Sequence, residues 1–381
     1  HKEYRRQRQM CIRDRIQIMN GFMIPGQEKI RGFLWSQLNK QKMGKVKLTM
    51  DVITMGRSSI DLYSQSIGAD FVDIKGFDAF VGGSPLNIAV GCSRLGLNAA
   101  LLTAVGTDKV GDFILNFLTK EQVNVEFIPK LSHARSSAVL LGIQPPDKFP
   151  LVFYRDNCAD SQLTIDHVDQ AQIENFKILE ISGTALNVEP SRSAVLYALE
   201  KAVKNDVDVI LDLDFRADQW SDVRSFGITT RSILPRVTIA IGTEEEVLAT
   251  ILDSEEQINI SDQQISAPTI SGNLDQAIQR ILALGVKILV VKNGSEGVTI
   301  HQLNKEPEKV PGFPVEVLNV LGAGDAFASG FIYGYLEGWD MYKSCRMGNA
   351  SGAQVVLQPG CANFMPTLEE SLLFIEAKGG F

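Results

Sequence analysis

The strongest chemical signal in this 381-residue sequence is a carboxylate that follows two closely spaced glycines. The run Leu321-Gly322-Ala323-Gly324-Asp325 precedes a segment of helical periodicity, which places a flexible turn at a helix N-terminus. Such a turn directs unpaired backbone N–H groups at one point, and the aligned peptide dipoles favour an anion there. We expect Gly322, Ala323 and Gly324 to bind a phosphoryl group in transfer, and Asp325 to accept the proton of the attacking hydroxyl.

The run also has a simpler explanation, in which the glycines form a tight turn and Asp325 only caps the helix. Phosphoryl transfer through a loosely bonded transition state needs little activation of the nucleophile, so a weakly basic carboxylate suffices. Charge stabilisation does most of the work, and one preorganised donor is worth roughly 10²- to 10³-fold in rate. Asp325 is therefore expected both to orient the hydroxyl and to accept its proton.

A second glycine-rich run, residues 82–96, begins another helix. Ser84 is a good N-cap, and Pro85 suits the first helical position. Asn87 then lies in the first turn, beside the closely approaching backbone of Gly83, where its amide can bind sugar hydroxyls as donor and acceptor. A capped helix explains the rest of the run but leaves Asn87 without a role.

The elements that would position these two runs alternate, from Asp51 onward, between strand-length apolar stretches and segments of helical period. This alternation predicts an α/β fold in which helices cover both faces of a doubly wound, mostly parallel sheet. Near-continuous apolar runs suit strands that are buried on both faces. The predicted strands are Val52–Met55, Ala100–Val105, Ile178–Ser182, Val207–Leu213, Thr238–Gly242 and Lys287–Lys292.

Two segments, residues 62–81 and 136–154, break this rhythm, and we expect them to form a small β lid over the main sheet. The polar stretch Asp253 to Asn273 is predicted to be a surface insertion. Apolar stretches are far shorter than the 18 or so residues that a membrane span needs, so no membrane segment is expected.

Charge is unevenly distributed along the chain. Residues 1–47 carry a net charge of +9, so the remainder carries −17 to give the total of −8. The acidic body argues against nucleic acid as a partner. The basic start lacks the apolar centre of a secretory signal. We expect residues 1–49 to be an N-terminal extension, disordered or foreign to the protein, with Met43 or Met50 as the natural start.

The cysteines and histidines narrow the chemistry further. The histidines lack partners at metal or triad spacing and there is no Gly-x-Ser-x-Gly elbow, which excludes hydrolase and zinc chemistry. The cysteines show no paired spacing typical of zinc sites or disulfides, so a reducing cytoplasm is expected. These cysteines are Cys11, Cys92, Cys158, Cys345 and Cys361.

Together, the Gly-Gly-x-x-x-Asn-x-Ala run with Arg94-Leu95-Gly96 and the distant Gly-Ala-Gly-Asp resemble the PfkB (ribokinase-like) family of carbohydrate kinases. The resemblance covers about residues 50–378. It implies a kinase domain with a β lid, a small sugar as substrate, ATP and Mg²⁺ as cofactors, and often a homodimer built through the lids.

Within the family, four further stretches are most similar to kinases of inositol catabolism that phosphorylate the terminal (6-) hydroxyl of 5-dehydro-2-deoxygluconate. The resemblance implies that Asp61, Gly83, Asn87 and Arg155 contact the substrate. Activity as a 2-keto-3-deoxygluconate kinase or a fructokinase is an alternative, and so is a non-catalytic sugar-binding regulatory protein. The four stretches are residues 55–62, 154–160, 181–186 and 241–246.

Arg155 also has a physical argument. A planar guanidinium pairs bidentately with a carboxylate, so it would hold a sugar acid better than a neutral sugar. The alternative is an ordinary ion pair with Asp156 or Asp160.

On the nucleotide side, the resemblance assigns Lys292, Gly294 and Gly297 to the ATP site and Asn349 to the neighbourhood of the adenine. Taken alone, the first segment indicates only a strand-turn-strand, and the small residues around Asn349 fit close helix packing equally well. Glu246 matches an acidic residue linked to Mg²⁺ through water, which suits an ion that keeps much of its hydration. A solvated carboxylate at a helix start is the alternative.

Asp214 and Arg216 follow a strand end where ligand sites of α/β folds normally lie, so we expect them to face the cleft. One departure from the family concerns a monovalent cation. Many relatives have Asp-Thr before Gly-Ala-Gly-Asp, and that side chain helps to bind the cation, whereas this chain has Asn319-Val320. The departure weakens the case for activation by K⁺.

Overall fold

The computed structural model describes residues 50–144, 148–259 and 268–381. The expected extension, residues 1–49, lies outside the described residues, as do short parts of the predicted lid and of the predicted insertion. Within the described ranges, no helix is long and apolar enough to cross a membrane.

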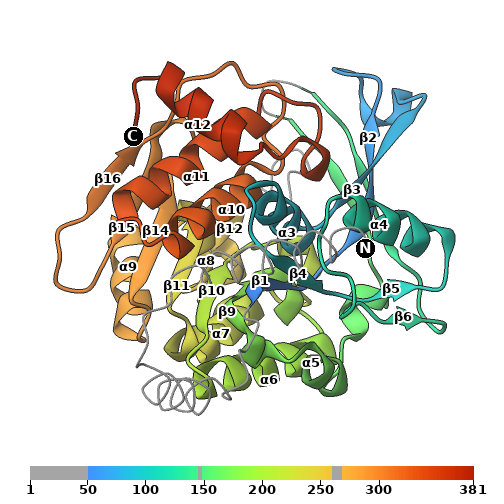
Figure 1. The fold of residues 1–381 in the computed structure, drawn as a ribbon, viewed down its shortest axis with the longest axis horizontal. Coiled ribbons are helices and arrows are strands. Elements are labelled where there is room, and N and C mark those ends of the chain that lie inside the picture. Colours follow the sequence, from blue (N-terminus) through green and yellow to red (C-terminus); the bar gives the residue numbers. More distant parts are fainter. Residues whose placement is uncertain (1–49, 145–147, 260–267) are drawn as a thin grey trace, which may run out of the picture. The chain divides into compact units, whose positions relative to one another are not determined.

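An eight-stranded sheet forms the centre of the fold (Figure 1). Six neighbouring strands run parallel, and two antiparallel strands extend one edge. Burial of the parallel strands on both faces explains their near-continuous apolar runs. In spatial order the strands are β16 (Glu308–Pro311), β15 (Gly297–His301), β14 (Ile288–Lys292), β11 (Ile239–Thr243), β10 (Asp208–Asp212), β9 (Phe176–Ser182), β1 (Met50–Met55) and β4 (Ala99–Leu102).

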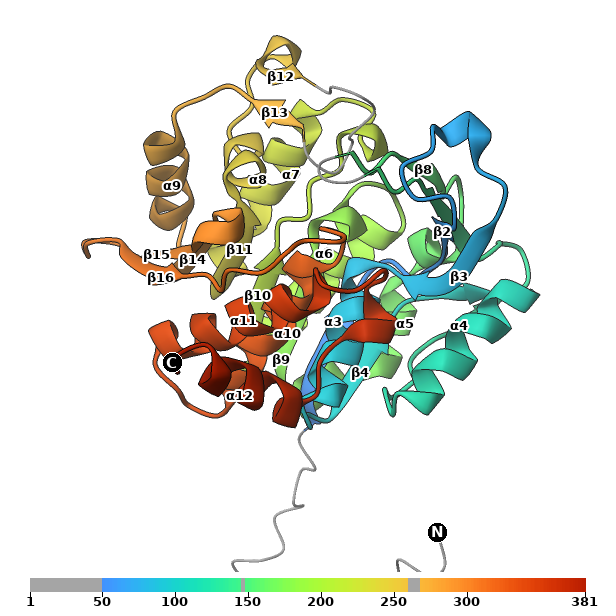
Figure 2. The same ribbon diagram turned by 90° about the horizontal axis from the view of Figure 1, so that it is seen from above.

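Helices cover both faces of this sheet (Figure 2). One face packs, through residues such as Leu179 and Leu211, against α5 (Ile165–Ala171), α6 (Ser191–Lys204), α7 (Arg224–Ile233), α8 (Glu244–Ala249) and α9 (Leu274–Ala283). The other face packs, through residues such as Ile178 and Ile210, against α3 (Ser84–Arg94), α10 (Ala323–Leu336) and α11 (Met341–Val355). Next to these lie α4 (Lys109–Lys120) and α12 (Leu368–Ala377).

All six predicted strands are present, but one of them divides. The prediction of a single strand over Ala100–Val105 is wrong, because the chain leaves the main sheet after β4 and forms β5 (Val105–Gly106). Val105 pairs instead with Lys130 of β6 (Lys130–Leu131). The strand-turn-strand indicated at Lys292–Gly297 is present as β14 and β15, whereas β16 was not predicted, since it is short and mostly exposed and lacks a buried apolar run.

A separate four-stranded sheet is built from the two segments that break the alternating rhythm. Its order is β3 (Phe77–Gly82), β2 (Ser59–Ser64), β7 (Ser137–Leu141) and β8 (Leu151–Tyr154). Tyr63, Val139 and Leu141 form a small apolar cluster on it. Within the predicted insertion, β12 (Ile258–Asn259) pairs with β13 (Thr269–Ile270).

Glu180, in the middle of β9, is an exception in this apolar interior. It is fully buried between Thr54 of β1 and Ile210 of β10, and neither carboxyl oxygen has a hydrogen-bond partner among the described residues. Burial raises its pKa well above the ordinary glutamate value of 4.5, and the negative charge of Asp212 adds to the rise. Glu180 is therefore protonated in the folded chain.

We predict that Glu180→Gln stabilises the fold increasingly as the pH rises. A carboxyl whose pKa is raised by folding contributes most to stability below its unfolded pKa, and this contribution is lost as the pH rises towards the folded pKa. The melting temperature of the variant, relative to wild type, should rise by at least about 2 °C between pH 5 and pH 8.

Thermal unfolding across this pH range checks the prediction. Glu200→Gln, at an exposed position of α6, is the matched control and should show no such trend. A difference between Glu180→Gln and wild type that stays constant with pH would contradict a protonated Glu180.

Candidate active site

A cavity lies where the carboxyl ends of the parallel strands meet the four-stranded sheet. Its wall combines the chain after β1 and after β10, strands β2, β7 and β8, and the first turns of α3 and α10. Of the predicted site residues, Asp61, Gly83, Asn87, Gly322 and Asp325 line this one cavity. Residues from three segments that are widely separated in the sequence are therefore brought together.

The N-terminus of α10 ends at this cavity without a cap from any side chain. Gly322 precedes the helix in the left-handed region, at φ 83°, and a Cβ at this position would overlap the Sγ of Cys361. The N-cap position thus favours glycine for two reasons, backbone conformation and space. Ala323 and Gly324 form the first turn, whose amides and helix dipole are suited to an anion.

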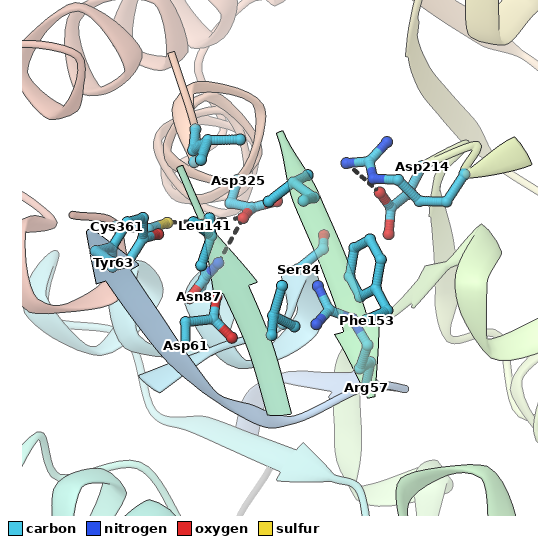
Figure 3. A pocket seen from close by; sticks show the side chains of 16 residues that line it. Arg57, Asp61, Tyr63, Ser84, Asn87, Leu141, Phe153, Asp214, Asp325 and Cys361 are labelled. Carbon is cyan, nitrogen blue, oxygen red and sulfur yellow. Dashed lines mark hydrogen bonds and ion pairs between the residues drawn. The ribbon is translucent and has the colours of Figure 1, made fainter. Parts of the chain in front are cut away.

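Asp325, in the first turn of α10, offers one carboxylate oxygen to the cavity. Its Oδ2 accepts a hydrogen bond from Asn87 Nδ2 at 2.7 Å, and the thiol of Cys361 donates to the same oxygen at 3.7 Å (Figure 3). Both of these hydrogen bonds end on Oδ2. Burial raises the pKa of Asp325, although the Asn87 hydrogen bond, and also Ser84 in the same wall, oppose the rise. The carboxylate is thus a stronger base than an ordinary aspartate.

Asn87 has one end of its amide free for a ligand. Its Oδ1 is buried and has no hydrogen-bond partner among the described residues, whereas its Nδ2 is held by Asp325. Gly83, just before α3, has φ 108°, and a Cβ there would overlap the backbone oxygen of Arg57. This close approach fixes the start of α3 against the chain that follows β1.

Asp61, on β2, lies in the same wall and is almost fully buried. The hydroxyl of Ser59 donates to its Oδ1 at 2.6 Å. Burial raises the pKa of Asp61, and the positive charge of Arg57 opposes this rise. The second oxygen can accept from a ligand hydroxyl.

A cluster of charges lies beside the first turn of α10. Lys292, at the end of β14, has its Nζ 3.5 Å from Asp212 Oδ1 and 3.6 Å from Glu246 Oε2. A Cβ added to Gly324 would lie 3.0 Å from the same ammonium, so Lys292 reaches the helix start. Burial raises the pKa of Asp212 to about 7. Burial alone would lower the pKa of Lys292, but the carboxylates of Asp212 and Glu246 outweigh it and raise the pKa.

Asp214 and Arg216 both line the cavity and pair with each other. Arg216 Nη2 lies 2.7 Å from Asp214 Oδ1, and Ser182 Oγ donates to Asp214 Oδ2 at 2.6 Å. Burial would raise the pKa of Asp214, but Arg216 and the Ser182 hydrogen bond outweigh it and lower the pKa. Asp214 also adopts φ 36°, which is unusual for a residue other than glycine.

Glu246, the predicted Mg²⁺ residue, occupies the first turn of α8. It forms a capping box with Thr243, whose backbone N–H donates to Oε2 at 2.8 Å. It is only 8% exposed, so the alternative of a solvated carboxylate is wrong. In the described ranges, no three His, Cys, Asp or Glu side chains converge on a point that could hold a metal ion.

The remaining nucleotide residues lie along the antiparallel edge of the sheet. Gly294 and Gly297 belong to the turn between β14 and β15. Asn349, on α11, donates from Nδ2 to the backbone oxygens of Val310 and Pro311 at 3.2 and 3.0 Å. These residues do not line the cavity that contains Asp325.

Arg155 also lies outside the lining of this cavity. Its Nε pairs with buried Asp160 at 2.7 Å, and its Nη1 donates to Thr184 O at 3.1 Å and to Gln219 Oε1 at 2.7 Å. The ion pair with Asp160, raised as an alternative from the sequence, is therefore present. Only Nη2 is buried without a partner among the described residues.

Several cavity residues were missed by the sequence interpretation. Arg57 stands inside a stretch that carried the family resemblance, so a signal for it existed. Phe153 and Cys361 carried none, because each becomes a cavity residue only through packing. Asn319, where the chain departs from many relatives, is buried and holds the turn before α10. Its Oδ1 accepts from Leu321 N, and its Nδ2 donates to Pro359 O.

Comparison with known proteins identifies the family of this chain. Residues 50–368 match the profile of the pfkB family carbohydrate kinases. The 5-dehydro-2-deoxygluconokinase of Clostridium perfringens is 35% identical over 331 residues, which are 87% of this chain and 94% of that protein. The protein of the same name from Bacillus anthracis is 33% identical over 329 residues, which are 86% and 95% of the two chains.

Solved structures agree on the fold. A fructokinase from Xylella fastidiosa with bound ATP has a TM-score of 0.73 at 21% identity, with 86% of this chain and 98% of that chain covered. A protein from E. coli described as a ribokinase II, in complex with ATP and Mg²⁺, has a TM-score of 0.74 at 23% identity, with 86% and 99% covered. This chain therefore belongs to the pfkB family of carbohydrate kinases and has the ribokinase-like fold that its sequence predicted.

Proposed function

We propose that this chain transfers the γ-phosphate of ATP to the terminal (6-) hydroxyl of 5-dehydro-2-deoxygluconate, a step of inositol catabolism. The observation that supports the chemistry best is the uncapped N-terminus of α10 beside the carboxylate of Asp325, whose Oδ2 accepts from both Asn87 and Cys361. The substrate is supported by the relatives named 5-dehydro-2-deoxygluconokinase, which match 86–87% of this chain.

In this proposal Asp325 Oδ1 accepts the proton of the 6-hydroxyl as its oxygen attacks phosphorus. Asn87 and Cys361 hold the other oxygen, which fixes the direction in which Oδ1 points. The amides of Gly322, Ala323 and Gly324 stabilise charge on the transferred phosphoryl group. Asp61, Gly83 and Asn87 contact the sugar, whereas Arg155 lies outside the cavity lining and is not supported as a substrate contact.

ATP would occupy the side of α10 that faces β14. Lys292 reaches the first turn of α10, where it can neutralise phosphate oxygens. Gly294 and Gly297 lie in the turn just beyond, and we propose that Asn349 lies near the adenine. Glu246 lies beside Lys292, and we propose that it contacts Mg²⁺ through water, which suits an ion that keeps much of its hydration. The ion itself would neutralise the phosphates.

Three further proposals are coarser. Residues 50–378 form the kinase domain, and the four-stranded sheet acts as its lid and as the surface of a homodimer. A cytoplasmic location fits the buried free thiols of the described cysteines. Asn319 is already bound to backbone groups at both ends of its amide, which agrees with a weak response to K⁺.

A substrate panel tests the proposed reaction. We expect kcat/KM for 5-dehydro-2-deoxygluconate to exceed the values for 2-keto-3-deoxygluconate, fructose and ribose by at least about tenfold, because polar contacts discriminate strongly. Coupled ATP turnover measures the panel. A higher kcat/KM for fructose or ribose would refute the substrate, and absence of turnover on every sugar would favour a regulatory sugar-binding protein.

Asp325→Asn should lower kcat by roughly 100-fold or more, since general-base loss falls in this range. Substrate binding, measured by calorimetry, should be largely retained because the amide fills the same space. Asp78→Asn, at an exposed position of β3, is the matched control and should keep full activity. Unchanged turnover in Asp325→Asn would refute the role of this carboxylate.

Asn87→Leu should move the acidic limb of the pH profile of kcat/KM to higher pH. Asn87 stabilises the ionised form of Asp325, so loss of its hydrogen bond raises a pKa that burial already raises. A larger fraction of Asp325 is then protonated at a given pH, so kcat/KM begins to fall at a higher pH on acidification. Steady-state kinetics from pH 5 to pH 9 measure the limb, and a shift to lower pH would contradict the assignment.

A further inference from the structure

We propose that Arg57 binds the carboxylate of the acid substrate and so places the opposite end of the sugar at Asp325. This inference rests on the proposed function and names the residue that selects an acid over a neutral sugar. It differs from the sequence-based expectation, which gave this role to Arg155.

Arg57 lies inside the cavity, directly after β1. It lines the same cavity as Asp325, and Figure 3 shows it with Phe153 on the side away from Cys361 and Tyr63. The carboxylate and the 6-hydroxyl of the substrate stand at opposite ends of a six-carbon chain. One sugar acid can therefore present its two ends to two separate parts of the wall.

The guanidinium of Arg57 has unused capacity for an anion. Among the described residues it forms no ion pair, and its one side-chain hydrogen bond runs from Nη1 to Ser59 Oγ at 3.0 Å. Its Nε is buried without a partner. Five N–H donors in a planar fork suit bidentate binding of a carboxylate.

Other arginines near the site have less to offer. Arg216 is paired with Asp214 at 2.7 Å, and Arg155 is paired with Asp160 at the same distance. An incoming carboxylate would have to compete with these partners. Arg57 has no such ion pair among the described residues, although its charge acts on the carboxylates of Asp61 and Asp214.

Local structure holds Arg57 in place. The guanidinium lies over the ring of Phe153, 5.1 Å from its centroid, which is a favourable cation–π geometry. The backbone of Arg57 touches Gly83, so it is fixed relative to α3 and Asn87. A cation stacked on one face keeps the edge of its fork available for a ligand.

The charge of the cavity wall makes a cation necessary for an acid substrate. The cavity is lined by three carboxylates, Asp61, Asp214 and Asp325, which would repel the carboxylate of an acid substrate. The positive charge of Arg57 opposes the rise in the pKa of Asp61, so it acts on the carboxylates of this wall. A neutral sugar gains nothing comparable from Arg57.

The test compares an acid with its neutral counterpart. Wild type, Arg57→Met, Arg57→Lys and Arg155→Met are assayed with 5-dehydro-2-deoxygluconate and with the analogue that has a hydroxymethyl group in place of the carboxylate. Arg57→Met should lower kcat/KM for the acid at least 100-fold, chiefly by raising KM. This loss should be at least tenfold larger than the loss of kcat/KM for the neutral analogue. Arg57→Lys should recover part of this loss, and Arg155→Met should affect both substrates alike.

Two outcomes would overturn the proposal. Equal losses on both substrates in Arg57→Met would show a structural role, and selective loss of the acid in Arg155→Met would move recognition to that residue. Calorimetric binding of gluconate separates this test from the proposed function. If wild type lacks the expected turnover, weaker gluconate binding by Arg57→Met still supports carboxylate recognition, and equal binding refutes it.

Discussion

The hydrogen bond between Asn87 and Asp325 joins the two helix starts on which the site depends. These residues are 238 positions apart, yet their side chains meet at 2.7 Å because α3 and α10 pack on the same face of the sheet. Ile88 and Cys92 share a core with Phe327 and Phe331, so apolar packing sets the distance between the helices. The polar contact then fixes which carboxylate oxygen faces the cavity.

Near this contact, buried carboxylates outnumber the cations beside them, an excess of negative charge that suits a site for a nucleotide with a divalent cation. Asp212, Asp214 and Glu246 are buried beside two cations, Lys292 and Arg216. Buried carboxylates without full compensation cost stability, and a rise in the pKa of Asp212 to about 7 is one consequence. A divalent cation carried by a nucleotide would relieve this excess while its phosphates meet Lys292. The repulsion among these carboxylates destabilises the free chain, and its relief on binding would favour the complex with the nucleotide and its cation.

Local signals predicted much of the fold but not its boundaries. Buried parallel strands are recognisable by their apolar runs, and glycines marked the starts of α3 and α10. The predicted N-cap at Ser84 is wrong, because Gly83 occupies the N-cap position and Ser84 is the first residue of α3. The split between β4 and β5 was missed because Thr103 and Ala104 are as buried as the strand before them. The positions of Gly322 and Asp325 at the start of α10 could be predicted because a helix start depends on local sequence, whereas the pairing of Arg155 with Asp160 is decided by side-chain packing.

By itself, the sequence determined the helix starts before Asn87 and Asp325 and the mostly parallel character of the sheet. These depend on near neighbours in the chain, through backbone conformation and hydrophobic periodicity. Only the tertiary structure decided which arginine is free. The sequence does not distinguish Arg57, Arg155 and Arg216. In the structure, Arg155 pairs with Asp160 and Arg216 pairs with Asp214. Such pairing follows from distances between distant segments, which no local pattern encodes.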